Sequence, residues 1–384
     1  MNNVVDGYFE TVASLTVPRA NHSATVLPDG SVLVVGGING SERNTPDAAD
    51  HPNLSPPVRA DQISWEQLRV AAIAPVADVE RYDSLEDTWH PTSPLAEARS
   101  RHCAVRLING QVMIIAGAGQ QRTLNSVELY NSTDDCWTAA TPLGTPRFAH
   151  TATLLNNGHV LVCAGNNQYQ GTGQVLDSVE IYDPANDSWT VAPWIPIARM
   201  DHSATLLASG EVLVLGGYSA TLNAAIDDAS LFDPVNRTWR NVNPLPEKRM
   251  QHTATLLTDG RVLVAGGTDE PFAHGRTGSY LYDPETDSWG PAMHLDFGRK
   301  GHSAATLRLG RVLVVGDTSD VSGAFVAEVF DPVSNHWTTS AELETGRFAH
   351  STRLLPSGQL IVAAGQLPMS HPAYTVSTEL FTER

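Results

Sequence analysis

One four-residue pattern recurs seven times along this chain and limits what the chain can fold into. An arginine is followed three positions later by a histidine at Arg19/His22, Arg99/His102, Arg147/His150, Arg199/His202, Arg249/His252, Arg299/His302 and Arg347/His350. A glycine stands eight residues after each histidine, usually behind Asp, Asn or Ser, which is typical of a hairpin turn that needs a positive φ angle. Such self-similarity predicts a repeat protein built from seven copies of one supersecondary unit.

Each copy carries the same later markers, which predict four short strands. The turn leads into an apolar run such as residues 32–35, and a second glycine stands fifteen residues after the histidine in six copies. In the sixth copy that position is Asp317. An aromatic residue then ends a third strand, at Tyr82, Tyr130, Tyr182, Phe232, Tyr282, Phe330 and Phe381. A tryptophan follows six of these aromatics after seven residues, at Trp89, Trp137, Trp189, Trp239, Trp289 and Trp337.

The two ends of the chain contain complementary parts of one copy. The seventh copy ends at Arg384 before it reaches a tryptophan, whereas Phe9 lies ten residues before Arg19, where a tryptophan would stand. We therefore expect residues 8–15 to supply the outer strand of the last blade, which would close a ring and remove two exposed sheet edges. The expected fold is all-β: a single domain over residues 1–384 that forms a seven-bladed propeller with four strands per blade.

These markers resemble the repeats of the Kelch family. The glycine pair, the Tyr-Asp-Pro sequences at Tyr182 and Tyr282 and the tryptophan stand at the spacing of a Kelch repeat, and the resemblance covers nearly the whole chain. Membership implies a β-propeller. It says little about function, because Kelch propellers include enzymes, sugar-binding proteins and protein adaptors.

The composition narrows the range of partners. Asp and Glu number 42 against 24 Lys and Arg, a formal net charge of −18, so the surface repels phosphate backbones and no nucleic-acid partner is expected. The sequence lacks an apolar run of about 18 residues, so no membrane span is expected. Cys103, Cys136 and Cys163 form no CxxC pair, and the N-terminus lacks a signal-peptide pattern. These features favour a reducing, cytoplasmic location.

The loops predict which face of the propeller carries the function. In a four-stranded blade, the connection into the first strand and the loop from the second to the third strand share one face, which we call the loop face; the short turns lie on the opposite, hairpin face. On the loop face an insertion over residues 38–75 lengthens the first copy. Ser64 could cap a short helix that has Trp65, Leu68 and Ile73 on one apolar side. We interpret the insertion as a lid over the channel mouth; the alternative is a disordered insertion without a role.

Several residues expected on the loop face are candidate site residues. Asp317 replaces a repeated glycine near the axis, where a carboxylate could bind a cation or act as a base; ordinary sequence drift is the alternative. Arg101 and His302 complete the predicted catalytic set. The residues predicted to bind a substrate are Trp65, Phe148, Tyr169, Asp201, Tyr218, Asp269 and Phe348. Most other polar residues of this face, among them Glu270 and Arg276, are interpreted as solvated loop residues.

The seven repeated histidines should form a ring around the axial channel. A residue repeated in every blade usually has the same packing or hydrogen-bonding task in each one, because imidazole can bridge groups at strand ends. The alternative is a metal site, in which a few histidines from nearby blades lean inward to bind iron, copper or zinc. His22, His302 and His350 are the candidate ligands.

The family resemblance gives the metal hypothesis a precedent. In galactose oxidase, a Kelch propeller, the copper-binding histidines correspond to His302 and His350, and the crosslinked cysteine aligns near Cys103. The tyrosines of that site would fall near Gly301 and Ala149, so the tyrosine–cysteine radical cofactor is not expected. A simpler histidine-bound iron or copper centre stays open, by analogy of architecture with the carotenoid cleavage oxygenases.

Two functions from different classes follow. The favoured one is an enzyme of specialised metabolism that binds a small organic substrate at the channel mouth, as a metal-dependent oxidoreductase or a metal-free cyclase or isomerase. The alternative is a non-catalytic binding module for a protein, peptide or glycan. Kelch adaptors usually carry a further domain, and this chain leaves no residues for one, which favours the enzyme. The even repetition of the histidines counts against it.

Overall fold

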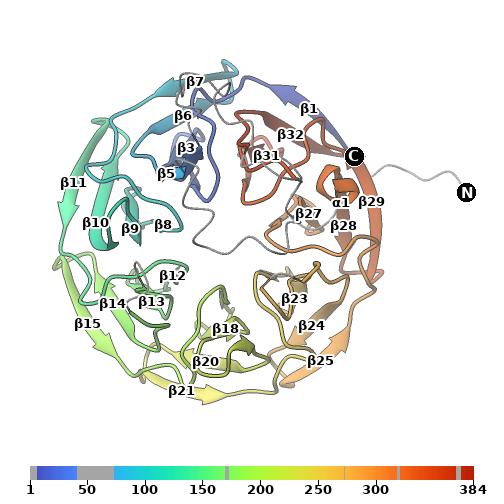
Figure 1. Ribbon diagram of the computed structural model, residues 1–384. Coiled ribbons are helices and arrows are strands. Elements are labelled where there is room, and N and C mark those ends of the chain that lie inside the picture. The colour runs from blue at the N-terminus through green and yellow to red at the C-terminus, as the bar shows by residue number, and fades with distance from the viewer. Residues whose placement is uncertain (1–6, 41–72, 169–172, 272, 318–320, 369–372) are drawn as a thin grey trace, which may run out of the picture.

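The propeller predicted from the repeats is the fold of the described chain. The computed structural model describes residues 7–40, 73–168, 173–271, 273–317, 321–368 and 373–384. These residues form seven four-stranded antiparallel sheets arranged as blades around a central axis (Figure 1). We number the blades 1–7 in the order of their arginines, from Arg19 in blade 1 to Arg347 in blade 7.

Within each blade the strands follow one another outward from the axis in sequence order, except in blade 7, whose outer strand comes from the start of the chain. The first strands are β2 (Ser23–Val26), β8 (Cys103–Arg106), β12 (Thr151–Leu154), β16 (Ser203–Leu206), β22 (Thr253–Leu256), β26 (Ser303–Thr306) and β30 (Ser351–Leu354). The second strands are β3 (Val32–Val35), β9 (Val112–Ala118), β13 (Val160–Cys163), β17 (Val212–Leu215), β23 (Val262–Ala265), β27 (Val312–Val315) and β31 (Leu360–Ala363).

The outer half of each blade holds the aromatic markers. The third strands are β6 (Val79–Asp83), β10 (Thr123–Asn131), β14 (Val179–Asp183), β20 (Ala229–Asp233), β24 (Ser279–Asp283), β28 (Val326–Asp331) and β32 (Thr378–Glu383). The outer strands are β7 (Thr88–Pro91), β11 (Cys136–Ala140), β15 (Ser188–Ala192), β21 (Thr238–Asn241), β25 (Ser288–Pro291), β29 (His336–Glu342) and β1 (Gly7–Val12). Three small elements lie on the loop face: the pair β4 (Ile38–Gly40) and β5 (Ile73–Pro75), the pair β18 (Tyr218–Ser219) and β19 (Ala224–Ala225), and helix α1 (Val321–Phe325).

The first and last strands of the chain close the ring. Strand β1 lies beside β32 (Figure 1) and pairs antiparallel with it, with Phe9 opposite Phe381. The ring centroids of these two phenylalanines are 5.1 Å apart, close to the 4.9 Å that separates Tyr130 from Trp137 in blade 2. Phe9 therefore occupies the place of the missing tryptophan, and the predicted closure is confirmed.

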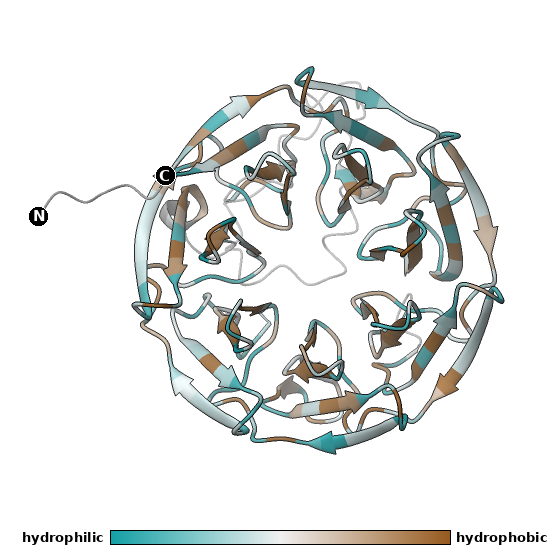
Figure 2. Ribbon diagram, turned by 180° about the vertical axis from the view of Figure 1, so that it is seen from behind, coloured by the Kyte–Doolittle hydropathy of each residue, from teal (hydrophilic) through white to brown (hydrophobic). Residues whose placement is uncertain are grey.

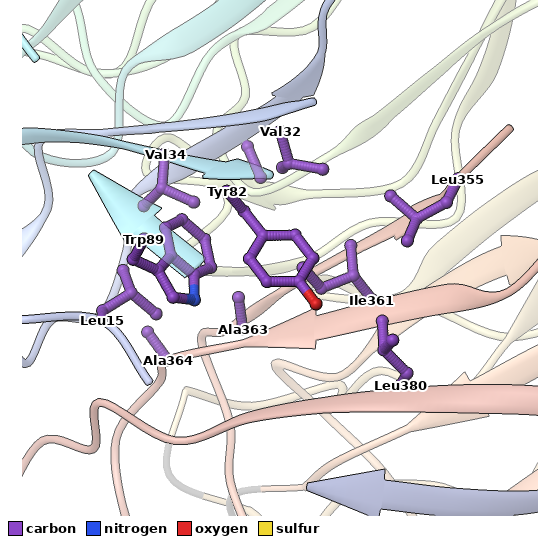
Figure 3. Packing of buried hydrophobic residues seen from close by; sticks show 11 residues of the cluster. Leu15, Val32, Val34, Tyr82, Trp89, Leu355, Ile361, Ala363, Ala364 and Leu380 are labelled. Carbon is purple, nitrogen blue, oxygen red and sulfur yellow. The ribbon is translucent and has the colours of Figure 1, made fainter. Parts of the chain in front are cut away.

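The hydrophobic core is divided among the seams between neighbouring blades. At the seam of blades 7 and 1, Tyr82 lies beside Ile361, and Trp89 lies near Leu15 and Ala364 (Figure 3). The apolar runs of the second strands are buried, and Figure 2 colours much of the inner strands as hydrophobic. Each blade therefore supports both neighbours, which leaves the connecting loops free to vary.

Part of the predicted site lies outside the described residues. The insertion over 38–75 is described only at its ends, where β4 pairs with β5 and Ile38 lies opposite Pro75. The predicted helix around Trp65 falls in the range 41–72, and Tyr169 falls in 169–172, so neither is described. In the chain that is described, no helix is long and apolar enough to cross a bilayer.

Candidate functional site

The repeated arginines are buried and hold each blade to the connection that leads into it. Arg147 in blade 3 is fully buried; its Nη1 donates to the carbonyls of Ala164 (2.8 Å) and Ser178 (3.0 Å). Its Nη2 donates to Glu180 Oε1 at 2.6 Å, and the other oxygen of Glu180 accepts from the backbone N–H of Gly144 at 2.8 Å. Burial lowers the pKa of Arg147, and the Glu180 carboxylate opposes that change.

Five blades share this pair between a buried arginine and a third-strand glutamate, which stands two residues before the aromatic marker. The pairs are Arg19–Glu80, Arg99–Glu128, Arg147–Glu180, Arg299–Glu328 and Arg347–Glu379. Every one of these glutamates is at most 6% exposed. We call this the regular arrangement. Blades 4 and 5 depart from it.

The repeated histidines form a belt of contacts between blades. Six imidazoles lie with Nε2 2.6–3.0 Å from a hydroxyl oxygen of the preceding blade; the pairs are His22–Ser351, His102–Ser23, His202–Thr151, His252–Ser203, His302–Thr253 and His350–Ser303. Burial lowers the pKa of His102, His202 and His302 to about 3, so these rings are neutral at pH 7. The belt fits the packing interpretation of the histidine repeat.

The belt has one exception, at the start of β8. Cys103 stands where the other blades carry Ser or Thr, and its Sγ donates to the His150 carbonyl at 3.1 Å instead of contacting the imidazole. Within the described chain, neither ring nitrogen of His150 has a hydrogen-bond partner. Burial raises the pKa of Cys103 to about 12, which keeps the thiol protonated and argues against a nucleophilic role.

A metal centre finds no support in this arrangement. His302 Nε2 lies 3.0 Å from Thr253 Oγ1, and His350 Nε2 lies 2.6 Å from Ser303 Oγ, so both candidate ligands are engaged between blades. Among the residues with described positions, no group of three or more His, Cys, Asp or Glu side chains is placed to hold a metal ion. Gly301 and Ala149 offer no phenol, so the chain does not fit a copper-radical site. His22, predicted as a third ligand, faces Ser351 in the same way as the others face their hydroxyls.

Asp317 is integrated into the core of blade 6. Its side chain is fully buried, and Oδ1 accepts from the backbone N–H of Lys300 at 3.0 Å. Its own N–H donates to the Arg347 carbonyl at 3.2 Å. A carboxylate buried in this way supports the loop around Lys300 and is not presented to a substrate, so the geometry does not favour the catalytic role predicted for it.

The residue that precedes each repeated histidine lies at the loop-face end of the axial channel; we call these seven residues the axial rim. They are Asn21, Arg101, Ala149, Asp201, Gln251, Gly301 and Ala349, with φ between 50° and 63°. Six of their backbone N–H groups donate to the rim carbonyl of the preceding blade; Arg101 N donates to Asn21 O at 3.0 Å, for example. Left-handed backbone is unfavourable for residues other than glycine, so the neighbouring blades must hold this conformation in place.

A side-chain contact crosses the axial rim. Arg101 Nη2 donates to Asp201 Oδ1 at 2.5 Å, which links blade 2 to blade 4 past the small Ala149. The Arg101 guanidinium also lies 5.3 Å from the centroid of the Phe148 ring. Three residues predicted for the site are thus brought together. Phe348 pairs with Gln366 in blade 7 and does not join them.

Blade 5 lacks the regular counter-ion of its buried arginine. Tyr280 stands where five blades carry glutamate, and the Arg249 guanidinium lies 5.0 Å from the centroid of its ring. Arg249 Nη2 instead donates to Glu247 Oε2 at 3.3 Å, and Glu247 is 36% exposed. Gly278 makes room for this carboxylate, because a Cβ atom there would lie 3.3 Å from Glu247 Oε2.

Blade 4 shows a milder form of the same departure. Ser230 replaces the third-strand glutamate, and Arg199 pairs with Asp228, whose side chain is 15% exposed. The two irregular blades are neighbours, and they border the same opening on the loop face.

A cavity of about 890 Å³ lies between the loops of blades 4 and 5; we call it the blade 4–5 pocket. The residues that line it are Tyr218, Asn223, Ala224, Ala225, Glu247, Lys248, Asp269, Glu270, Pro271, Ala273 and Arg276. The hairpin β18–β19 forms one wall, where Tyr218 Oη donates to Asn223 Oδ1 at 2.7 Å. The loop between β23 and β24 forms the other.

Arg276 connects the charged groups of this pocket. Its Nη1 donates to Glu247 Oε2 at 3.1 Å, and its Nη2 donates to Asp269. The hydrogen bond from Arg276 lowers the pKa of Asp269, and the same contact raises the pKa of Arg276. Behind the wall, Lys300 Nζ donates to the Ala273 carbonyl at 2.5 Å.

The blade 4–5 pocket adjoins the axial rim. Met200 pairs with Tyr218 and precedes Asp201 of the rim; Met250 pairs with Thr268, the residue before Asp269. Tyr218 and Asp269 were both predicted from the sequence, whereas Glu247 and Lys248 were missed. The replacement of the third-strand glutamate by Tyr280 was the signal that could have found Glu247.

Comparisons with known proteins agree on the fold. The family model described as Attractin/LZTR1 beta-propeller matches residues 74–321. Kelch domain-containing protein 7A of Mus musculus is 31% identical over 158 residues, which cover 40% of this chain and 19% of that protein's length. A solved fungal alcohol oxidase of the AA5 family, in complex with copper, superposes with a TM-score of 0.73 at 13% identity, over 98% of this chain and 76% of the oxidase chain. At that identity the likeness concerns the fold alone.

Proposed function

The chain belongs to the attractin/LZTR1 β-propeller family, and from that premise we propose that it is a non-catalytic Kelch binding module whose loop face holds a polypeptide partner. The blade 4–5 pocket is the proposed centre of the binding surface, and the axial rim extends it toward the channel. The single observation that carries the proposal is the charged cavity between the two blades that depart from the regular arginine–glutamate pairing.

The chemistry of the pocket suits a polypeptide better than a small organic substrate. Five of its eleven lining residues are charged: Glu247, Lys248, Asp269, Glu270 and Arg276. Pockets for small molecules are mostly apolar with a few polar groups, whereas protein interfaces commonly carry a polar, charged rim. A partner segment with side chains of both charges could pair with the exposed Lys248 and Glu270 and contact Tyr218 with its apolar parts.

The enzyme hypothesis has weaker support. His302, predicted as catalytic, is tied to Thr253, and Asp317 is buried in blade 6. Arg101, the third predicted catalytic residue, is paired with Asp201 and lies over Phe148, an arrangement that suits a binding surface as well as a reaction centre. The alcohol oxidase with the similar fold adds no functional argument at 13% identity.

A peptide-display experiment tests this function. Random twelve-residue peptides are selected on the purified protein, and the affinity of the selected peptides is measured on a Lys248→Glu/Glu270→Lys variant. We expect these two reversals, which keep the net charge, to weaken binding by about ten-fold or more, since paired charges at an interface fix orientation and specificity.

A matched variant on the hairpin face provides the control. Glu211 and Arg240 form an ion pair there, with Arg240 Nε 3.1 Å from Glu211 Oε1, and Glu211→Lys/Arg240→Glu reverses it without changing the net charge. The control should bind the selected peptides within about two-fold of the original protein, as expected for a distant and independent site. Equal losses in both variants, or a failure to select any peptide, would refute the proposed function.

A further inference from the structure

The arginine at the start of each repeat provides an internal comparison for blade 5. In the regular blades its carboxylate partner comes from the third strand and is nearly inaccessible, as for Arg299 and Glu328, both 0% exposed. In blade 5 the partner comes from the connection that precedes the arginine, on the loop face. The cation of blade 5 lies in the core as in the other blades, whereas its counter-ion lies in the wall of the blade 4–5 pocket.

Glu247 contacts three groups at once in this new position. Its Oε2 accepts from the buried Arg249 at 3.3 Å and from Arg276 of the pocket at 3.1 Å. Tyr280 is the third; burial, followed by the negative charge of Glu247, raises its pKa. One carboxylate is thus fixed by the core on one side and orients a pocket side chain on the other.

Arg276 transmits this order to the far wall of the pocket. Its planar fork is held between two carboxylates, because Nη1 donates to Glu247 and Nη2 to Asp269. A guanidinium with both ends engaged has little freedom to rotate. The direction of Asp269 therefore depends on Arg276, which depends in turn on Glu247.

We infer that Glu247 is the positioning residue of the blade 4–5 pocket: it replaces the missing third-strand carboxylate of blade 5 and, through Arg276, orients Asp269 toward the ligand. The inference rests on the proposed binding function for its relevance to a partner. A purely structural role is the competing explanation, in which Glu247 only neutralises Arg249 and its contact with Arg276 is incidental.

The two roles separate when the third-strand carboxylate is restored. Glu247→Gln leaves Arg249 without an ionised partner, and we expect the urea midpoint of unfolding to fall. Glu247→Gln/Tyr280→Glu places a glutamate where five other blades have one, and we expect the midpoint to recover. In blade 3 the serine two residues before the glutamate also accepts from the arginine, since Arg147 Nη2 lies 3.1 Å from Ser178 Oγ. Blade 6 has Val326 at that position and still forms the pair, so the lack of a serine in blade 5 should not prevent it.

The double variant should regain its stability without regaining the order of the pocket side chains. Arginine-selective ¹⁵N labelling follows rotation of the Arg276 guanidinium by NMR, and we expect slow rotation in the original protein and fast rotation in both variants. The peptides selected by display should bind the double variant about ten-fold more weakly or worse, because the charged wall has lost its orientation. Glu180→Gln, the matched change in blade 3, should lower the midpoint and leave Arg276 unchanged.

The outcomes distinguish the inference from the proposed function. A double variant with a recovered midpoint, a slowly rotating Arg276 and unchanged peptide affinity would overturn the positioning role and leave Glu247 as a counter-ion only. Fast rotation of Arg276 with unchanged peptide affinity would support the positioning role and count against the pocket as the binding site. If Glu247→Gln alone fails to fold, the double variant still decides, because its core pair is complete.

Discussion

Blades 3 and 5 are built from the same repeat and differ in where they keep one negative charge. Arg147 and Arg249 are both fully buried, and each donates to two backbone carbonyls of its own blade. The partner of Arg147 is the core residue Glu180, whereas the partner of Arg249 is the half-exposed Glu247. Blade 3 therefore has a closed ion pair, and blade 5 has one that opens onto the molecular surface.

The difference teaches how a repeat acquires a site without losing its fold. A buried guanidinium without a counter-ion is strongly unfavourable, so the blade must keep a carboxylate within reach. It need not keep that carboxylate on the third strand. Once Glu247 supplies the charge from the loop face, the third strand can carry Tyr280. Gly278, directly before that strand, leaves space for the Glu247 carboxylate beside the pocket.

Lowering the pH should produce the largest change in the free energy of unfolding. It tests whether the histidine belt stabilises blades 3 and 5 to the same extent. The pKa of His202 and His302 is lowered to about 3 from 6.5, so the unfolded chain binds more protons than the folded one between those values. The stabilisation by these neutral rings is complete above pH 6.5 and is lost progressively as the pH falls toward 3. A pKa that differs by one between the folded and unfolded chains corresponds to about 1.4 kcal/mol of stability, so a few such histidines together contribute several kcal/mol.

Urea unfolding at pH 7.0, 5.5 and 4.5 measures this dependence. We expect the midpoint to fall steadily over that series, with fluorescence probes in blades 3 and 5 reporting the same transition. A midpoint that stays constant down to pH 4.5 would contradict the burial of neutral imidazoles. Different midpoints from the probes in blades 3 and 5 would show that the histidine belt stabilises the two blades unequally.

Removing the carboxylate from each blade gives the next largest effect. Glu180→Gln should cost about 3–5 kcal/mol in the free energy of unfolding, because it leaves Arg147 buried with no ionised partner. Glu247→Gln should cost less, about 1–3 kcal/mol, because the buried Arg249 loses its ionised partner but solvent reaches the exposed side of this pair and can replace part of the lost interaction. Urea denaturation of the two variants side by side measures the difference, and equal costs would remove the distinction between the closed and the open pair.

The repeat made the fold predictable from the sequence. The spacing from Arg19 to the aromatic markers placed four strands in every blade, and Phe9 identified the strand that closes the ring. These features are set by local turn chemistry and by packing that recurs seven times, so one copy confirms another. The loop face could be predicted for the same reason, because the direction of each strand follows from the order of the strands.

The site was only partly predictable, because its determinants do not repeat. Tyr218 and Asp269 could be predicted because they stand one and two residues after a repeated glycine. The Arg101–Asp201 contact could not, because it joins residues two blades apart. Asp317 was singled out because it departs from the repeat consensus. Its burial and its hydrogen bond from the Lys300 N–H show that the core of the blade can accommodate such a substitution. The absence of the third-strand glutamate from blade 5 was equally visible in the sequence, and it mattered more.

Cys103 offers the smallest and most local test of the comparison, because blades 3 and 5 differ in the belt as well. His252 of blade 5 contacts the Ser203 hydroxyl at 2.8 Å. In blade 3 the equivalent position of the preceding blade is Cys103, and His150 Nε2 has no partner within the described chain. Cys103→Ser supplies the missing hydroxyl and should stabilise the protein by about 0.5–1.5 kcal/mol, the net value of one hydrogen bond in a buried setting. Cys103→Ala removes the thiol without adding a partner and should bring no gain. Urea midpoints of the two variants decide the matter: a gain shared by serine and alanine would assign the effect to loss of the sulfur, and a gain confined to serine would show that blade 3 lacks one contact that blade 5 has.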